Sequence, residues 1–264
     1  MTDTATPIDL AHAATETAPG DDAARLRFYE RLADAELFLL LEREAQGDKV
    51  DPKVFETEDG IFLLAFDRED RLADFAEGPA PYLALSGRVL AGMMAGQDLG
   101  LGVNLGVAPS SSLLPAEAID WLAETLAQGP EEAEDHPLEL TAPAHLPEAL
   151  LTALDAKFAT MAGRAKFAYL CGVRYHSGRR GHLLAFIQTV DGAEPALARA
   201  VNEALAFSGL EAGALDVAFF VASDPVAATL SRVGLRFDLP QAGPAPLTPR
   251  AAPGSDPGKP PILR

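Results

Sequence analysis

Hydrophobic positions in the first half of the chain predict an alternation of short strands and amphipathic helices. Unbroken apolar runs predict strands, and apolar residues spaced three or four apart predict helices. Asp59-Gly60, between two apolar runs, predicts a β-hairpin. The predicted strands are residues 37–41, 54–57, 61–66, 82–85 and 99–103, and the predicted helices are residues 22–32, 67–75, 86–93 and 115–127.

The second half shows the same alternation with a different order. The predicted strands are residues 138–141, 166–175, 182–190, 215–222 and 235–239, and the predicted helices are residues 147–158, 194–207 and 224–230. Ser177-Gly178 joins the second and third strands as a hairpin. This order is typical of a small, mostly antiparallel sheet with helices on one face.

The length of 264 residues favours two domains, because compact domains cluster near about 100–150 residues. We predict the α+β class, with two mixed α/β sandwich-like domains. The predicted segments are a disordered lead-in (1–21), an N-terminal domain (22–128), an acidic linker (129–137), a C-terminal domain (138–240) and a proline-rich, disordered tail (241–264).

A glycine-rich stretch, residues 98–112, resembles a phosphate-binding loop ahead of a helix. A dinucleotide-binding loop read from Gly100 and Gly102 would require glycine at position 105, where Leu105 stands. The pattern therefore favours a buried strand that ends in a turn, followed by a helix that begins near Pro115.

Charge is distributed unevenly along the chain. Residues 1–136 contain 28 Asp and Glu against 9 Lys and Arg, a net charge of −19, whereas the rest of the chain is close to neutral. An acidic surface repels nucleic acids and anionic membranes, so we expect neither as a partner. Two interpretations stay open: the acidity keeps the protein soluble, or it steers a basic partner to the N-terminal domain.

Cysteine usage and the start of the chain favour a cytoplasmic location. Cys171 is the single cysteine, so no intramolecular disulfide forms. The start of the chain, Met1-Thr2-Asp3-Thr4, lacks the cationic and apolar regions of a secretory signal.

Two groups of residues are candidate binding sites. The first is a helix start followed by a glycine–serine loop, which together could hold a small anion: Ser86, Arg88, Asn104, Gly106, Ser110 and Ser111. The second is the basic hairpin with Arg174, Arg179 and Arg180, which could hold an anionic group. The structural alternatives are a capped helix with a surface arginine and a solvated hairpin tip.

Catalytic signatures are absent from the sequence. Ser110, Ser111 and Ser112 lack the Gly-x-Ser-x-Gly pattern of hydrolases, and Cys171 has no basic neighbour in sequence to activate it. His176 and His182 have no further metal-ligating residues nearby. We therefore assign no catalytic residue, metal or cofactor, and expect that the protein is not an enzyme.

Several short motifs resemble the enhanced-serine-sensitivity (SseB) family. They are Ala35-Glu36-Leu37-Phe38-Leu39, the Asp59-Gly60 hairpin, Pro81-Tyr82, Leu85-Ser86-Gly87-Arg88 and Gly102-Val103-Asn104-Leu105-Gly106. Residues 138–239, with Pro147-Glu148-Ala149-Leu150-Leu151 and Ala168-Tyr169-Leu170, are similar to the C-terminal domain of that family. The family tends to show Asn-Pro-Gly where this chain has Asn104-Leu105-Gly106.

The resemblance implies a link to amino-acid metabolism but no reaction. Our first hypothesis is a cytosolic, non-catalytic binding or regulatory protein whose acidic N-terminal domain docks a basic protein partner. The alternative is an enzyme or sensor for a small anionic metabolite, related to an amino acid, bound at Ser86 and the loop from Asn104.

Overall fold

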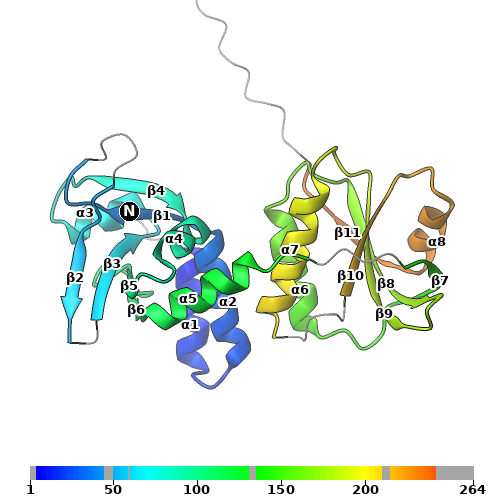
Figure 1. The fold of residues 1–264 in the computed structure, drawn as a ribbon, viewed down its shortest axis with the longest axis horizontal. Coiled ribbons are helices and arrows are strands. Elements are labelled where there is room, and N and C mark those ends of the chain that lie inside the picture. Colours follow the sequence, from blue (N-terminus) through cyan, green and yellow to red (C-terminus); the bar gives the residue numbers. More distant parts are fainter. Residues whose placement is uncertain (1–3, 45–49, 59, 131–134, 210–214, 242–264) are drawn as a thin grey trace, which may run out of the picture.

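A computed structural model describes residues 4–44, 50–58, 60–130, 135–209 and 215–241 of the chain. Two α+β domains lie side by side (Figure 1), which confirms the predicted fold class. The helices are α1 (Pro7–Thr17), α2 (Asp22–Asp34), α3 (Glu69–Phe75), α4 (Gly87–Met94), α5 (Ala116–Ala127), α6 (Glu148–Ala159), α7 (Glu194–Phe207) and α8 (Pro225–Val233). The strands are β1 (Glu36–Leu40), β2 (Val54–Thr57), β3 (Gly60–Phe66), β4 (Tyr82–Ser86), β5 (Leu99–Val103), β6 (Ser112–Leu114), β7 (Pro137–Thr141), β8 (Phe167–Tyr175), β9 (Arg180–Ile187), β10 (Leu215–Phe220) and β11 (Leu235–Asp238).

The N-terminal domain is built on a mixed sheet with the order β4-β1-β3-β5-β6, and β2 pairs with β3. Strands β3 and β5 run parallel, and the remaining pairs are antiparallel. Helices α1, α2, α4 and α5 pack on one face of this sheet and bury a large apolar core. The opposite face carries α3, with a much smaller core formed by Leu40, Leu64, Phe66 and Leu72.

The glycines of β5 make room for neighbouring side chains. A Cβ at Gly100 would lie 2.5 Å from the Phe62 ring, and one at Gly102 would lie 2.8 Å from Leu105 and 2.9 Å from Leu64. The predicted strand is confirmed, and its glycines let large side chains of β3 and the following loop pack across it.

The C-terminal domain has the strand order β10-β9-β8-β11, with β7 paired to β8. Alternate residues of β8 face two different cores: Ala168 and Leu170 lie with α6 and α7, whereas Tyr169 and Cys171 lie with α8. The prediction of helices on one face is therefore wrong for α8. Both faces of β8 and β9 are apolar, so each face requires a cover.

The N-terminal segment also differs from the prediction. Instead of a disordered lead-in, residues 7–17 form α1, whose Ile8 side chain is buried in the core. Thr6 and Asp9 form a capping box, and Pro7 occupies the first turn. The predicted tail from residue 242 lies outside the described residues, as do residues 131–134 of the predicted linker.

The two domains meet where α7 packs against α2 and α5 (Figure 1). Phe207, from the end of α7, belongs to the core of the N-terminal domain, and its ring lies 6.2 Å from that of Trp121. Gln128 accepts a hydrogen bond from Asn202 of α7. The domains therefore share part of one core.

Candidate functional site

The thinly covered face of the N-terminal sheet has a hollow on each side of α3. The first hollow, of about 670 Å³, is lined by Glu36, Phe38, Asp67, Arg68, Glu69, Asp70 and Ala73. The second, of about 420 Å³, is lined by Phe55, Asp74, Phe75, Glu77, Leu105, Gly106 and Val107. We call α3 and these two sets of residues the α3 face. It lies on the side of the N-terminal domain that is remote from the C-terminal domain (Figure 1).

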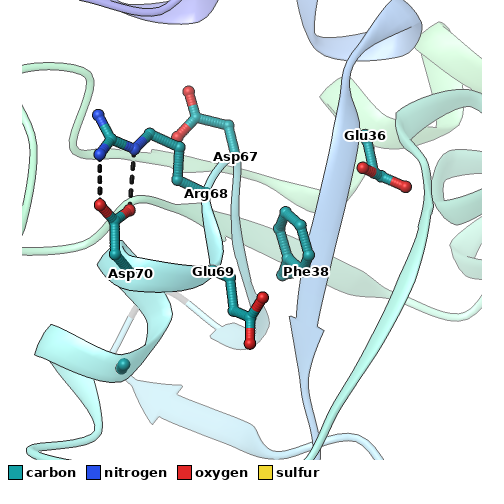
Figure 2. A pocket seen from close by; sticks show the side chains of 7 residues that line it. Glu36, Phe38, Asp67, Arg68, Glu69 and Asp70 are labelled. Atoms are coloured by element: carbon teal, nitrogen blue, oxygen red, sulfur yellow. Dashed lines mark hydrogen bonds and ion pairs between the residues drawn. The ribbon is translucent and has the colours of Figure 1, made fainter. Parts of the chain in front are cut away.

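Carboxylates dominate the first hollow, and its one lining arginine is engaged with one of them. Arg68 donates from Nε to Asp70 Oδ1 at 2.8 Å, and this interaction lowers the pKa of Asp70. Glu36 and Glu69 are exposed and flank the Phe38 ring (Figure 2). The hollow therefore presents an aromatic surface with negative charge around it.

A second aromatic residue extends this surface. The rings of Phe38 on β1 and Tyr82 on β4 meet edge to face, with their centroids 5.3 Å apart. The Tyr82 hydroxyl donates a hydrogen bond to Glu69, and partial desolvation together with this carboxylate raises the pKa of Tyr82. Tyr82 thus stays a neutral donor to Glu69 at the edge of the hollow.

The second hollow repeats the combination of aromatic surface and acidic rim. Phe55 on β2 is 43% exposed, and Phe75 at the end of α3 packs against Phe66 with centroids 5.3 Å apart. Asp74 and Glu77 lie at the rim and are exposed. Both hollows can therefore bind the same kind of ligand, namely an apolar group that carries or adjoins a positive charge.

A buried network of charged and polar groups fixes α3 in place. Arg71 of α3 donates to both carboxylate oxygens of Asp9, at 2.6 and 3.1 Å, and to Asp67 at 2.9 Å. Ser110 donates to Asp9 at 2.5 Å. Burial by itself would raise the pKa of Asp9, but the hydrogen bonds from Arg71 and Ser110 lower it well below its ordinary value. The network joins α1, α3 and the loop after β5.

The loop residues of the first predicted binding site help to form this network. Asn104 accepts from the Asp67 N–H and donates to Ser110 Oγ, and both side chains are fully buried. Ser111 Oγ accepts from the Gly106 N–H. The structure therefore shows these groups bonded within the chain, where they shape the loop between β5 and β6.

The other two residues of that predicted site lie at the start of α4. Ser86 is the N-cap residue, but its side chain makes no capping hydrogen bond. Arg88 donates to Glu203 at 2.8 Å and to Asp34 at 2.7 Å, at the contact between the domains. Arg88 and Asn104 thus belong to different hydrogen-bonded clusters, and a ligand shared between them remains a prediction from the sequence.

The predicted anion site on the β8–β9 hairpin is partly neutralised by neighbouring carboxylates. Arg174 forms an ion pair with Glu139, and Arg179 forms one with Asp216 while stacking on the Tyr175 ring at 4.3 Å. Arg180 is the register partner of Arg174 and is exposed. Anion binding by these three arginines also remains a prediction.

Between the domains the structure reveals a buried ion cluster that the sequence did not predict. Lys157 of α6 lies 2.7 Å from Asp34, 2.9 Å from Glu203 and 3.7 Å from Glu30, and Arg88 contacts two of the same carboxylates. The side chains of Glu30, Lys157 and Glu203 are at most 2% exposed. The sequence does carry a signal: Lys157 and Glu203 interrupt the apolar faces of their helices.

Burial affects the two glutamates of this cluster differently. Desolvation raises the pKa of Glu30, and Lys157 only partly opposes it. Desolvation also acts on Glu203, but the hydrogen bond from Arg88 and the charge of Lys157 lower its pKa below the ordinary value. Glu203 is thus the better compensated of the two charges.

Comparison with known proteins places the α3 face within a family domain. Residues 10–121 match the family model described as the SseB protein N-terminal domain. Over these residues the chain is similar to the SseB family. No curated protein and no solved structure matches the chain. The SseB resemblance is therefore confirmed for the N-terminal domain, whereas an SseB-like C-terminal domain remains a prediction.

The residues that the structure describes lack two other kinds of feature. They contain no group of three or more His, Cys, Asp and Glu side chains placed to hold a metal ion. Within the same part of the chain, no helix combines the length and apolar character that crossing a membrane requires.

Proposed function

We propose that this chain is a cytoplasmic, non-catalytic binding protein whose SseB domain docks a basic protein partner through the α3 face. The observation that carries the proposal is the composition of this face. Aromatic rings that are exposed or half-buried lie among carboxylates, and the lining arginine, Arg68, is engaged by Asp70.

The two kinds of group contribute differently to docking. Aromatic surface supplies most of the binding energy when it is buried in an interface. Exposed carboxylates around it attract a basic surface, accelerate association and make binding sensitive to salt. The net charge of −19 over residues 1–136 extends this attraction beyond the face itself.

The small-metabolite alternative receives less support from the geometry. It requires Arg88 and the loop from Asn104 to bind one ligand, whereas Arg88 bonds to Glu203 and Asp34 and the Asn104 side chain bonds to Ser110. Protein docking uses groups that are already exposed. We therefore favour docking over metabolite binding.

A capture experiment with charge-reversal variants tests the proposal. The immobilised full chain is exposed to an extract of its source cells, and bound proteins are identified by mass spectrometry. We expect capture of a protein with a basic surface at low salt, and its loss at high salt. The variant Glu36→Lys/Glu69→Lys/Asp74→Lys should abolish this capture.

A matched variant controls for net charge. Glu16→Lys/Glu117→Lys/Glu124→Lys makes the same change in charge at exposed positions of α1 and α5, so it should retain capture. Equal loss in both variants would show that only overall charge matters. We call Glu36→Lys/Glu69→Lys/Asp74→Lys the α3-face variant. If this variant captures the partner as well as the native chain does, docking at the α3 face is contradicted.

A further inference from the structure

The α3 face has the chemistry that recognises a proline-rich, basic segment. Such segments bind grooves lined by aromatic side chains, because proline stiffens the chain and reduces the entropy lost on binding. Phe38 and Tyr82 supply aromatic surface on one side of α3, and Phe55 and Phe75 supply it on the other. Acidic side chains at both hollows complement lysine and arginine.

The chain itself contains a segment of this kind. Residues 242–264, which lie outside the described part of the structure, include seven prolines and carry Arg250, Lys259 and Arg264 against a single acidic residue, Asp256. The segment finishes with Lys259-Pro260-Pro261-Ile262-Leu263-Arg264, in which two aliphatic residues lie between basic ones. Its positive charge is opposite in sign to that of the N-terminal domain.

We propose that residues 257–264 bind to the α3 face and compete there with the external partner. Lys259 and Arg264 pair with carboxylates at the hollows, and the prolines, Ile262 and Leu263 cover the exposed rings. This inference rests on the proposed function, since it assigns a regulator to the same docking surface. Because the competitor is part of the chain, its effective concentration stays high at any protein concentration.

Regulation follows from this competition. A partner must displace the segment before it can bind. The apparent affinity of the partner is therefore its intrinsic affinity multiplied by the fraction of molecules in which the α3 face is free. Partners with several basic residues and a larger apolar anchor are favoured over weakly basic proteins. The segment thereby makes the α3 face more selective, because weakly basic proteins cannot displace it.

Nuclear magnetic resonance of the full chain tests the contact directly. The native chain is compared with a variant of the segment, Lys259→Glu/Ile262→Asp/Arg264→Glu. We expect amide shifts to change at Glu36, Phe38, Asp74, Phe75 and their neighbours, and to stay constant in the C-terminal sheet. Unchanged shifts throughout the α3 face, or changes confined to another surface, would overturn the inference.

A labelled synthetic peptide of residues 250–264 provides a second measurement. It should bind the full chain that carries the segment variant about tenfold or more tightly than the native chain, because the native segment competes with it. Glu36→Lys/Glu69→Lys/Asp74→Lys, combined with the segment variant, should abolish peptide binding, whereas Glu16→Lys/Glu117→Lys/Glu124→Lys should retain it.

The two proposals fail in different ways. If the α3-face variant abolishes capture of the basic partner but the peptide does not bind, docking stands and the inference about the segment is wrong. If the peptide binds the α3 face but no basic protein is captured, the segment contact stands and the proposed function is wrong.

Discussion

Individual residues decide how closely the helices of the N-terminal domain approach one another. Gly87 begins α4 where this helix touches the end of α2, and its N–H donates to Ala35 O at 2.9 Å. A Cβ at position 87 would lie 1.9 Å from the Leu32 carbonyl oxygen. A backbone atom cannot move aside as a flexible side chain can, so this contact requires glycine.

Substitution of Gly87 should therefore be costly. We expect Gly87→Ala to lower the free energy of unfolding by about 2 kcal/mol or more, because it forces two backbones apart. Gly92 lies in the same helix with nothing within 4 Å of its added Cβ. Gly92→Ala should raise stability by about 0.5–1 kcal/mol through helix propensity. Urea unfolding of both variants measures the difference; equal effects would contradict this account.

Asp9 should make stability depend on pH. The pKa of Asp9 is lowered in the folded state, so its contribution is present above the ordinary value of 3.8 and is lost as the pH falls toward the lowered value. Asp9→Asn removes one of the carboxylates that pair with the buried Arg71, leaving Asp67, and should cost about 3 kcal/mol at pH 7. Urea unfolding between pH 7 and pH 3 should show a flatter pH dependence for the variant than for the native chain.

At the scale of elements, α1 shows how tertiary contacts complete a weak local signal. The segment is rich in alanine and has few apolar residues, so periodicity alone predicts no packed helix. Its capping box, the buried Ile8 side chain and the ion pair from Asp9 to Arg71 hold it against the domain. Because Arg71 belongs to α3, α1 also helps to position the candidate docking face.

Two substitutions within α1 test whether the helix is part of the folded domain. Ile8 is 1% exposed and Leu10 is 65% exposed. Ile8→Ala should lower the free energy of unfolding by about 2–4 kcal/mol, because it leaves a cavity in the core. Leu10→Ala should change it by less than about 0.5 kcal/mol. Thermal unfolding compares the two, and similar melting temperatures would mean that α1 does not dock as described.

At the scale of the whole molecule, the buried ion cluster and Phe207 join the two domains. Buried ion pairs specify geometry because each charge requires its partner, but they add less net stability than their Coulomb attraction suggests. The five groups come from α2, α4, α6 and α7, so both domains contribute. The arrangement fixes the α3 face on the side away from the C-terminal domain.

Removing the central cation should weaken the interface. Lys157→Met leaves Glu30, Asp34 and Glu203 with fewer positive charges and should cost about 3 kcal/mol. Trp121 is the single tryptophan and lies beside Phe207, so its fluorescence reports on this contact. Lys166→Met, at an exposed lysine of the C-terminal domain, is the control. If both substitutions change the free energy of urea unfolding equally, the ion cluster does not stabilise the interface between the domains.

Cleavage between the domains gives a further test. A glutamate-specific protease should cut at Glu131, Glu132 or Glu134, which lie between the two domains in the sequence. We expect the two fragments to stay together in gel filtration at neutral pH, because α7 contributes Phe207 to the core of the N-terminal domain. In the Lys157→Met variant the fragments should separate more readily. Immediate separation of the native fragments would contradict a shared core.

The sequence by itself determined most of the elements. Apolar runs predicted β1, β3 and β5, the Asp59-Gly60 pair predicted the β2–β3 hairpin, and helical spacing predicted α7 over the observed residues. Short motifs also predicted the SseB domain, which the family match confirms. These features depend on residues a few positions apart, where backbone geometry imposes a fixed period.

Only the tertiary structure decided how the polar residues are used. Arg88 resembled a ligand-binding residue beside Ser86, yet its partner is Glu203, 115 positions away. The acidic composition was visible in the sequence, but the grouping of Glu36, Glu69 and Asp74 with aromatic rings follows from the thin cover that α3 gives to one face of the sheet. Charge and hydrogen-bond partners are set by contacts between distant segments, and local periodicity carries no information about which segments meet.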